Sequence, residues 1–121
     1  MKFNKELMKG STNMLVLSLL QEENMYGYQM IKRLSEKSNN LFDLQEGTLY
    51  PILHGLEEKG LIESYWDETT SKKRKYYCIT KKGKKCLKEK KEEWSTFSNG
   101  INQVIDTGID LMDTNNGTDV T

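Results

Sequence analysis

The side chains of this 121-residue chain that could do chemistry are few. His54 is the single histidine, and the two cysteines, Cys78 and Cys86, lie in no CxxC motif or Cys/His cluster. This pattern excludes a multi-histidine metal site and gives no support for zinc. A Ser/His/Asp set, a phosphate-binding glycine loop and paired buried carboxylates are also missing. The sequence therefore predicts no enzyme, no cofactor and no metal. Both cysteines are expected to be reduced structural thiols, with a redox switch as the alternative.

A second chemistry is suggested by a run of four adjacent cations, Lys72, Lys73, Arg74 and Lys75. The run closes the polar segment DETTSKKR, which separates two stretches rich in β-branched and aromatic residues, 61–66 and 75–80. This arrangement predicts a β-hairpin with a long polar tip. Because a hairpin tip has no core to cover, we expect these cations to contact the phosphates of a nucleic acid.

An amphipathic helix is predicted directly before the hairpin. Leu49, Ile52, Leu53 and Leu56 recur at i, i+3, i+4 and i+7, the spacing of one buried helical face. We expect the helix to begin at about Thr48, so that Pro51 falls in the tolerant first turn. Gly60 is a stop that can adopt positive φ.

The residues of this helix that do not pack are the candidate readers of DNA. If the helix enters a major groove by its N-terminal end, Tyr50, Pro51 and His54 would point at base edges. Gln45 and Thr48 would then lie close to phosphates at the helix start.

The segment upstream completes a recognisable arrangement. Residues 25–37 place Met30, Ile31 and Leu34 on one face of a helix, and a polar turn then leads to the helix that begins near Thr48. Two short helices followed by a hairpin predict a winged helix-turn-helix. The expected fold class is α+β, mainly α.

Three motifs make the chain similar to the PadR family of bacterial transcriptional regulators. They are YGYQM at 26–30, EGTLYPILHGLEEKGLI at 46–62 and KRKYYCITKKGKKCL at 73–87, and the resemblance covers roughly residues 5–112. It implies a homodimeric winged-helix protein that binds double-stranded DNA, usually as a repressor. Such a protein leaves its operator when a small molecule binds. Two alternatives stay open: a winged-helix module for protein association, and a DNA binder with no ligand response.

Net charge hides a strong segregation along the chain. The formal net charge is zero, yet residues 72–91 hold eleven Lys and Arg and only one acid, Glu89. From Glu92 onward there are six acids and no basic residue. The basic half suits a polyanion. For the lysines of 81–91, a solvated helix face remains the alternative.

The C-terminal segment predicts a helix that needs a partner. An apolar, heptad-like stripe this long on a helix leaving a small domain is most simply covered by a second copy of the chain. We therefore expect a winged-helix domain over 1–80, a dimerisation helix over 81–113 and a disordered tail over 114–121. The stripe comprises Leu87, Trp94, Phe97, Ile101, Val104 and Leu111, widened by Ile105, Ile109 and Met112.

Trp94 has two interpretations. Its place in the stripe suits an aromatic residue of the dimer core. Small PadR proteins that sense many drugs, which this chain resembles in EEWSTFSNGI, instead imply a tryptophan that stacks on a flat aromatic effector at the dimer axis. In that case Asn13 and Met14 would line the same cavity. Lys91, one turn before Trp94, departs from the apolar wall that a drug cavity favours.

Hydrophobicity places the chain outside the membrane. No run of about eighteen apolar residues exists, and the N-terminus lacks a signal-peptide pattern. The apolar run at 14–20 is too short to span and is expected to form a buried helix. The expected protein is cytoplasmic and has no membrane partner.

Overall fold

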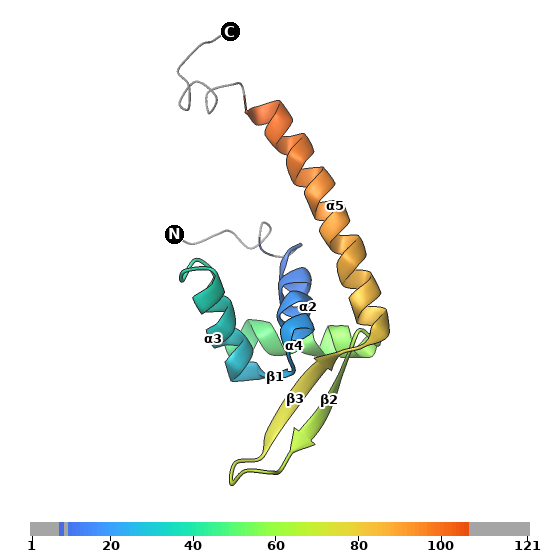
Figure 1. Cartoon of the computed structure of the whole chain (residues 1–121). Coiled ribbons are helices and arrows are strands. Elements are labelled where there is room, and N and C mark those ends of the chain that lie inside the picture. The colour runs from blue at the N-terminus through green and yellow to red at the C-terminus, as the bar shows by residue number, and fades with distance from the viewer. Residues whose placement is uncertain (1–7, 9, 107–121) are drawn as a thin grey trace. The chain divides into compact units, whose positions relative to one another are not determined.

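The fold is seen in a computed structural model, which describes residues 8 and 10–106 (Figure 1). Its described residues form two compact units, one up to Lys88 and one from Glu89 onward. The fold is mainly helical with one small antiparallel sheet, as predicted. In chain order the elements are α2 (Thr12–Glu22), β1 (Met25–Tyr26), α3 (Gly27–Lys37), α4 (Glu46–Glu58), β2 (Ile62–Asp67), β3 (Arg74–Ile79) and α5 (Lys81–Ile105).

One hydrophobic core holds the first unit together. Helix α2 is central to it, because its apolar run buries four side chains, as the run at 14–20 predicts. The expected face of α4 is also confirmed: Leu49, Leu53 and Leu56 are buried and Ile52 packs against them. The remaining core members come from every other element of the unit, namely Met25, Met30, Leu34, Leu44, Leu61, Ile62, Tyr77 and Leu87.

The turn between α3 and α4 is built by small polar residues. Asn39 and Asn40 have φ of 53° and 65°, in the left-handed region that asparagine tolerates better than most residues. The Ser38 hydroxyl donates to the Leu34 carbonyl oxygen at 2.8 Å and accepts the Phe42 amide at 3.0 Å. These bonds satisfy backbone groups at the end of α3 and turn the chain toward α4.

Helix α4 begins earlier than the sequence suggests. Its first residue is Glu46, and the carbonyl oxygen of Gln45 accepts the amides of Thr48 at 3.0 Å and Leu49 at 2.9 Å. The prediction that Pro51 lies in the first turn is therefore wrong, because Pro51 falls inside the helix. Its missing amide leaves the Gly47 carbonyl without the usual helical donor. Both Gly47 and Pro51 are exposed, so water can replace that bond.

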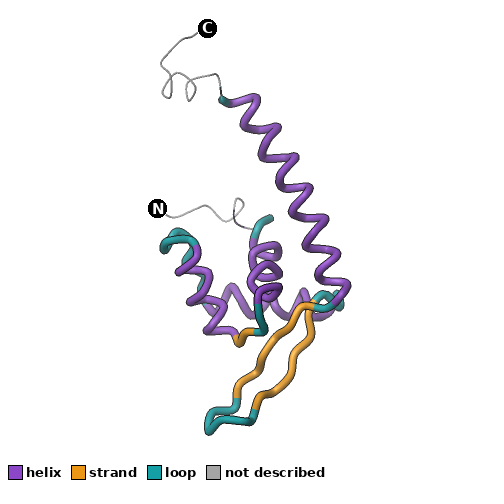
Figure 2. The backbone as a smooth tube through the Cα atoms, in the orientation of Figure 1, coloured by secondary structure: helices purple, strands orange, loops and turns teal. Residues whose placement is uncertain are grey.

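The sheet has the strand order β1-β3-β2, with both pairings antiparallel (Figure 2). Strands β2 and β3 form the expected hairpin and project away from the three helices of the unit. Tyr77 of β3 faces the core, whereas Tyr76 faces the other side, as strand alternation requires. Strand β1 was not predicted. Its two residues pair with Tyr76 and Tyr77 and bring the start of α3 to the hairpin.

The hairpin ends and α5 begins through close contacts around Gly60 and Gly83. Gly60 has φ of 74°, which confirms the predicted helix stop. Leu87 departs from the prediction: it is only 1% exposed in a single chain because it belongs to the core of the first unit. It has almost no surface left for a partner, so it is removed from the predicted dimer stripe.

Candidate nucleic-acid interface

One face of α4 is exposed along its N-terminal half. Leu49 and Leu53 anchor the opposite face in the core, so Tyr50, Pro51 and His54 are left on the surface. Tyr50 is 37% exposed, because part of its ring lies against the backbone of Gly27 at the start of α3. The structure thus places these three candidate readers on one helix face, and gives Tyr50 an additional packing contact.

The N-terminal end of α4 suits an anion. Gln45 caps the helix through its backbone, with no side-chain cap, and both Gln45 and Thr48 are exposed. The first amides of any α-helix lack intrahelical acceptors and carry the positive end of the helix dipole. A phosphate placed there would be held by amides and by these two polar side chains.

The wing comprises β2, β3 and the turn between them, and its cations fall into two pairs. Lys72 and Lys73 lie in the turn and are exposed, whereas Arg74 and Lys75 are the first residues of β3 and are half-buried. The Lys73 ammonium lies 3.5 Å from Glu68 and 5.4 Å from the Trp66 ring centroid. Contacts of this kind restrict the cation while leaving it accessible to solvent.

The turn of the wing has an internal brace. The Asp67 carboxylate accepts the Thr69 amide at 3.0 Å and the Thr69 hydroxyl at 2.7 Å. These bonds, aided by the charge of Arg74 across the strand pair, lower the pKa of Asp67. An ionised carboxylate that accepts a backbone amide two residues later is a common way to shape a turn. The turn therefore holds its basic residues on an ordered frame.

Cations of α3 are engaged in ion pairs with the end of α2. The Arg33 guanidinium contacts Glu22 at 3.4 Å and Glu23 at 2.9 Å, and the Lys37 ammonium contacts Glu22. The hydrogen bond from Lys37, together with the charges of Lys37 and Arg33, lowers the pKa of Glu22. Because these charges are mutually compensated, α3 contributes less positive potential than the wing does.

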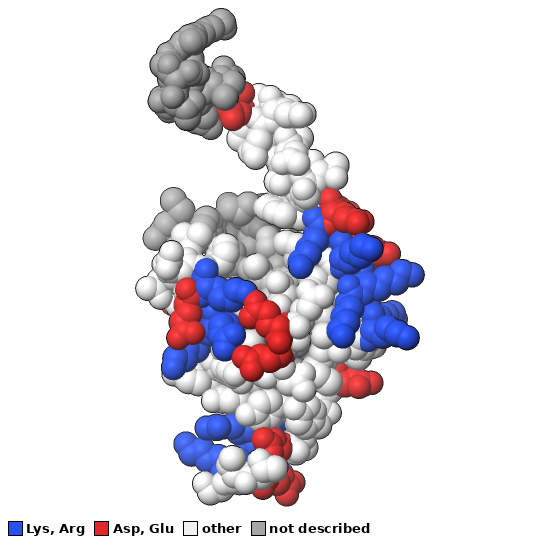
Figure 3. Space-filling model, in the orientation of Figure 1, with Lys and Arg blue, Asp and Glu red and all other residues white. Residues whose placement is uncertain are grey.

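A further basic surface covers the first turns of α5 (Figure 3). The Lys82 ammonium donates to the Lys59 carbonyl oxygen at the end of α4, at 2.9 Å. Cations near a helix C-terminus are favourable, whereas cations in the first turn of α5 oppose its dipole. Whether this surface meets phosphates or only water stays open. Its exposed lysines are Lys81, Lys82, Lys84, Lys85 and Lys88.

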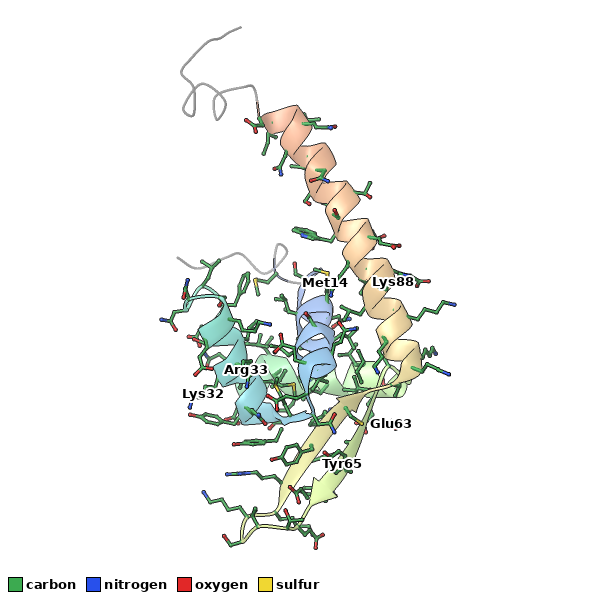
Figure 4. All side chains as sticks on the ribbon, in the orientation of Figure 1. Met14, Lys32, Arg33, Glu63, Tyr65 and Lys88 are labelled. Atoms are coloured by element: carbon green, nitrogen blue, oxygen red, sulfur yellow. The ribbon has the colours of Figure 1, made fainter. Side chains whose placement is uncertain are left out.

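Sequence reasoning missed an aromatic cluster on the wing face that points away from the core (Figure 4). Tyr76 lies between two other tyrosines, with ring centroids 5.4 Å from Tyr26 and 5.8 Å from Tyr65. The Arg74 guanidinium lies 4.5 Å from the Tyr26 ring centroid. Only the pairing of β1 with β3 brings Tyr26 to this face. The hint available in the sequence is the spacing of Arg74 and Tyr76, which puts both on one side of a strand.

The remaining predicted residues lie on the helices α2 and α5. Asn13 and Met14 of α2 are half-buried (Figure 4). Trp94 of α5 is 49% exposed, and its ring centroid lies 6.4 Å from that of Phe97. Met112, Leu111, Ile109 and the tail at 114–121 fall outside the described residues. Large apolar side chains exposed on α5 are Trp94, Phe97, Ile101, Val104 and Ile105.

Other kinds of site were searched for in the described part of the chain. Over residues 8 and 10–106, His, Cys, Asp and Glu form no group of three or more that could hold a metal ion. Within the same residues, no helix has the length and apolar character that crossing a membrane requires. Cys78 and Cys86 are free thiols and half-buried.

Together, the turn between α3 and α4, the exposed face of α4 and the basic hairpin define a winged helix-turn-helix, a class of DNA-binding domain. The profile of the Transcriptional regulator PadR-like family matches residues 16–89. This chain therefore belongs to the PadR-like family and is a DNA-binding transcriptional regulator.

Individual relatives agree with this assignment. Uncharacterized protein X of Lysinibacillus sphaericus is 36% identical over 102 residues, which cover 84% of this chain and 90% of that protein. A transcriptional regulator from Clostridium thermocellum has a TM-score of 0.77 and 38% identity, covering 82% of this chain and 97% of its own. A PadR family transcriptional regulator from Eggerthella lenta has a TM-score of 0.75 and 38% identity, covering 84% and 88% respectively.

Proposed function

We propose that this protein is a repressor that binds a pseudo-palindromic operator as a homodimer and is released by a flat aromatic effector bound near Trp94. One observation carries the DNA-binding part of the proposal. The exposed residues Tyr50, Pro51 and His54 share a face of α4, and the same compact unit carries the basic wing. A groove-reading helix next to a cationic hairpin suits duplex DNA better than a protein partner, which has little need of four adjacent cations.

The residues divide into two roles on the DNA. Tyr50, Pro51 and His54 read base edges in the major groove, where each base pair presents its own pattern of donors, acceptors and methyl groups. Phosphate contacts set the register and contribute most of the salt-dependent affinity. This second role falls to Gln45 and Thr48 at the start of α4 and to Lys72, Lys73, Arg74 and Lys75 of the wing.

The homodimer is supported by the exposed side of α5. Trp94, Phe97, Ile101 and Val104 follow one another at steps of three and four residues, and each is exposed in a single chain. This is the spacing of a coiled-coil seam. A second copy of the same helix would bury the stripe and would set two copies of α4 at a fixed separation, as a palindromic operator requires.

The effector site is supported by Trp94 and by the family to which the chain belongs. Trp94 presents half of its surface to solvent beside Phe97, so it offers an aromatic face on which a flat molecule can stack. Asn13 and Met14 are proposed to complete the site, Met14 as an adaptable wall. An effector that favours one arrangement of the dimer helices over another would change the spacing of the two copies of α4 and release the DNA.

The proposal is tested by footprinting the protein on its own promoter DNA with and without a flat aromatic cation or a phenolic acid. We expect a symmetric footprint that weakens when the compound is added. Quenching of tryptophan fluorescence by the same compound should be lost in Trp94→Phe, which retains Trp66 as the only tryptophan. Quenching that survives in Trp94→Phe would move the effector away from Trp94. A footprint that no compound alters would favour a DNA binder with no ligand response.

A further inference from the structure

Two consecutive residues, Tyr26 and Gly27, lie where three elements meet. Tyr26 ends β1 and pairs with Tyr76 of β3, and Gly27 is the first residue of α3. Each of the two also touches an element of the proposed DNA interface. Gly27 meets Tyr50 of α4, and Tyr26 meets Arg74 of the wing.

Gly27 leaves room that Tyr50 fills. A Cβ atom added at Gly27 would lie 2.3 Å from the Tyr50 hydroxyl oxygen and 2.8 Å from the adjoining ring carbon. Nothing in the backbone demands glycine, since Gly27 has no positive φ. Alanine is also the better helix former. The close approach of the Tyr50 ring is therefore the physical reason for a glycine here, and that approach fixes where Tyr50 lies on α4.

Tyr26 holds Arg74 on the outer face of the wing. The guanidinium lies over the ring at 4.5 Å, and the ring meets Tyr76 edge to face at 5.4 Å. Tyr76 in turn stacks on Tyr65, whose hydroxyl accepts the Asn24 side-chain amide at 3.2 Å. Arginine stacks well on aromatic rings and loses many conformations when it binds. An arginine already held on a ring loses fewer of them.

We propose that Tyr26 and Gly27 form a joint that sets the recognition helix and the wing relative to each other for DNA binding. Gly27 positions Tyr50 on α4, and Tyr26 holds Arg74 in the arrangement in which it contacts a phosphate. Both are positioning residues and need not touch the DNA. This inference rests on the proposed function, because it assumes that Arg74 and Tyr50 contact the operator.

The Tyr26 half is tested by measuring the affinity for promoter DNA across a series of salt concentrations. Each lost phosphate contact lowers the slope of log K against log salt by about 1. We expect Arg74→Ala and Tyr26→Leu to lower the slope equally, and the double variant to lower it no further. Tyr26→Phe, which keeps the ring, should retain the wild-type slope. The matched control is Tyr28→Leu, because Tyr28 is 61% exposed on α3.

The outcomes separate the joint from the proposed function. If Arg74→Ala leaves the slope unchanged, the wing contact itself is wrong and the joint falls with it. If Arg74→Ala lowers the slope while Tyr26→Leu does not, only the joint is overturned. A measurement without DNA supports the reading: the Arg74 side-chain protons should show an upfield ring-current shift that Tyr26→Leu abolishes and Tyr26→Phe keeps.

The Gly27 half is tested with a double-mutant cycle between Gly27→Ala and Tyr50→Ala. We expect Gly27→Ala to weaken operator binding by about tenfold, which corresponds to ~1.4 kcal/mol. In the Tyr50→Ala background the same substitution should have no further effect, since the displaced ring is gone. Equal losses in both backgrounds would overturn the inference.

Thermal unfolding guards against simple loss of the fold. Gly55→Ala serves as the matched control, because nothing lies within 4 Å of a Cβ added there. Gly27→Ala should lower the unfolding midpoint relative to Gly55→Ala, and Tyr50→Ala should restore it. A midpoint that stays low after Tyr50→Ala would show that Gly27 is required for a reason other than Tyr50, which would overturn the joint.

Discussion

Thr80 is the residue that ties the C-terminal helix to the hairpin. Its hydroxyl donates to the Gly60 carbonyl oxygen at 2.7 Å and accepts the Gly83 amide at 3.0 Å. The second bond is that of a helix N-cap, three residues before its donor. The Thr80 amide also donates to the Leu61 carbonyl oxygen at 3.0 Å. A single side chain thus satisfies polar groups at the end of α4, in the hairpin and at the start of α5.

We expect Thr80→Ala to lower the free energy of unfolding by about 1–2 kcal/mol, since it removes the cap and leaves the Gly60 carbonyl without this donor. Thr80→Ser keeps the hydroxyl and should lose a small part of that amount. Urea denaturation of the three proteins at one protein concentration makes the comparison. Equal stability of the alanine and wild-type proteins would contradict the capping role.

Tyr77 makes stability sensitive to alkaline pH. It is only 2% exposed, and burial raises its pKa, with smaller contributions from Glu57 and Tyr50. A raised pKa means that the folded protein keeps the phenol proton where the unfolded chain loses it. The corresponding stability is fully present below the ordinary tyrosine pKa of about 10 and is lost as pH rises through the folded pKa.

The prediction for Tyr77 is a smaller alkaline loss of stability in Tyr77→Phe than in the wild type. Urea unfolding at pH values on both sides of 10 measures it. Tyr28→Phe is the control, because Tyr28 is exposed and its removal should leave the alkaline loss unchanged. Identical pH profiles for wild type and Tyr77→Phe would show that Tyr77 titrates alike in both states.

At the scale of elements, the packing of α5 on the hairpin depends on Gly83. A Cβ atom there would lie 2.1 Å from the Leu61 carbonyl oxygen and 2.7 Å from Cγ1 of Ile79. The first of these atoms belongs to the backbone, which cannot move aside as a side-chain end can. The start of α5 can therefore approach the strands only because residue 83 lacks a side chain.

Gly83→Ala should consequently destabilise the domain by about 1–3 kcal/mol, the usual effect of overpacking, although alanine is the better helix former. Gly55→Ala in α4 adds the same methyl group where nothing lies within 4 Å, so it should be neutral or stabilising. Chemical denaturation distinguishes the two. A Gly83→Ala protein as stable as Gly55→Ala would contradict the close packing of α5.

Local patterns in the sequence predict those parts of the elements that depend on near neighbours. The spacing of Leu49, Leu53 and Leu56 predicts the buried face of α4, and Gly60 predicts its end. The beginning of α4 was placed too late because the backbone of Gln45 caps it and no polar side chain marks the position.

Parts that depend on distant residues could not be predicted. Strand β1 is too short to leave a pattern, and only its pairing with β3 reveals it. The contacts of Tyr26 with Arg74 and of Gly27 with Tyr50 follow from that pairing and from the packing of α3 on α4. Leu87 fits the heptad spacing of α5 as well as a core position, and spacing alone cannot tell one from the other.

At the scale of the whole molecule, the exposed stripe on α5 predicts dimerisation. Ile101→Glu places a charge within the stripe and should shift the protein toward monomer, because a buried unpaired carboxylate is strongly unfavourable. Gln103→Glu introduces the same group on the opposite side of the helix and should leave the dimer intact. Sedimentation velocity over a range of concentrations measures the change. An Ile101→Glu protein that associates like wild type would remove this stripe from the interface.

The central claim is that duplex DNA is bound by the N-terminal half of α4 together with the wing. It is tested most directly by following the backbone amide chemical shifts of the protein, residue by residue, while promoter DNA is added. We predict that the shifts change most at residues 45–54 and 72–75, and that the change weakens as salt is raised. Large changes elsewhere with these two segments unaltered would contradict the account.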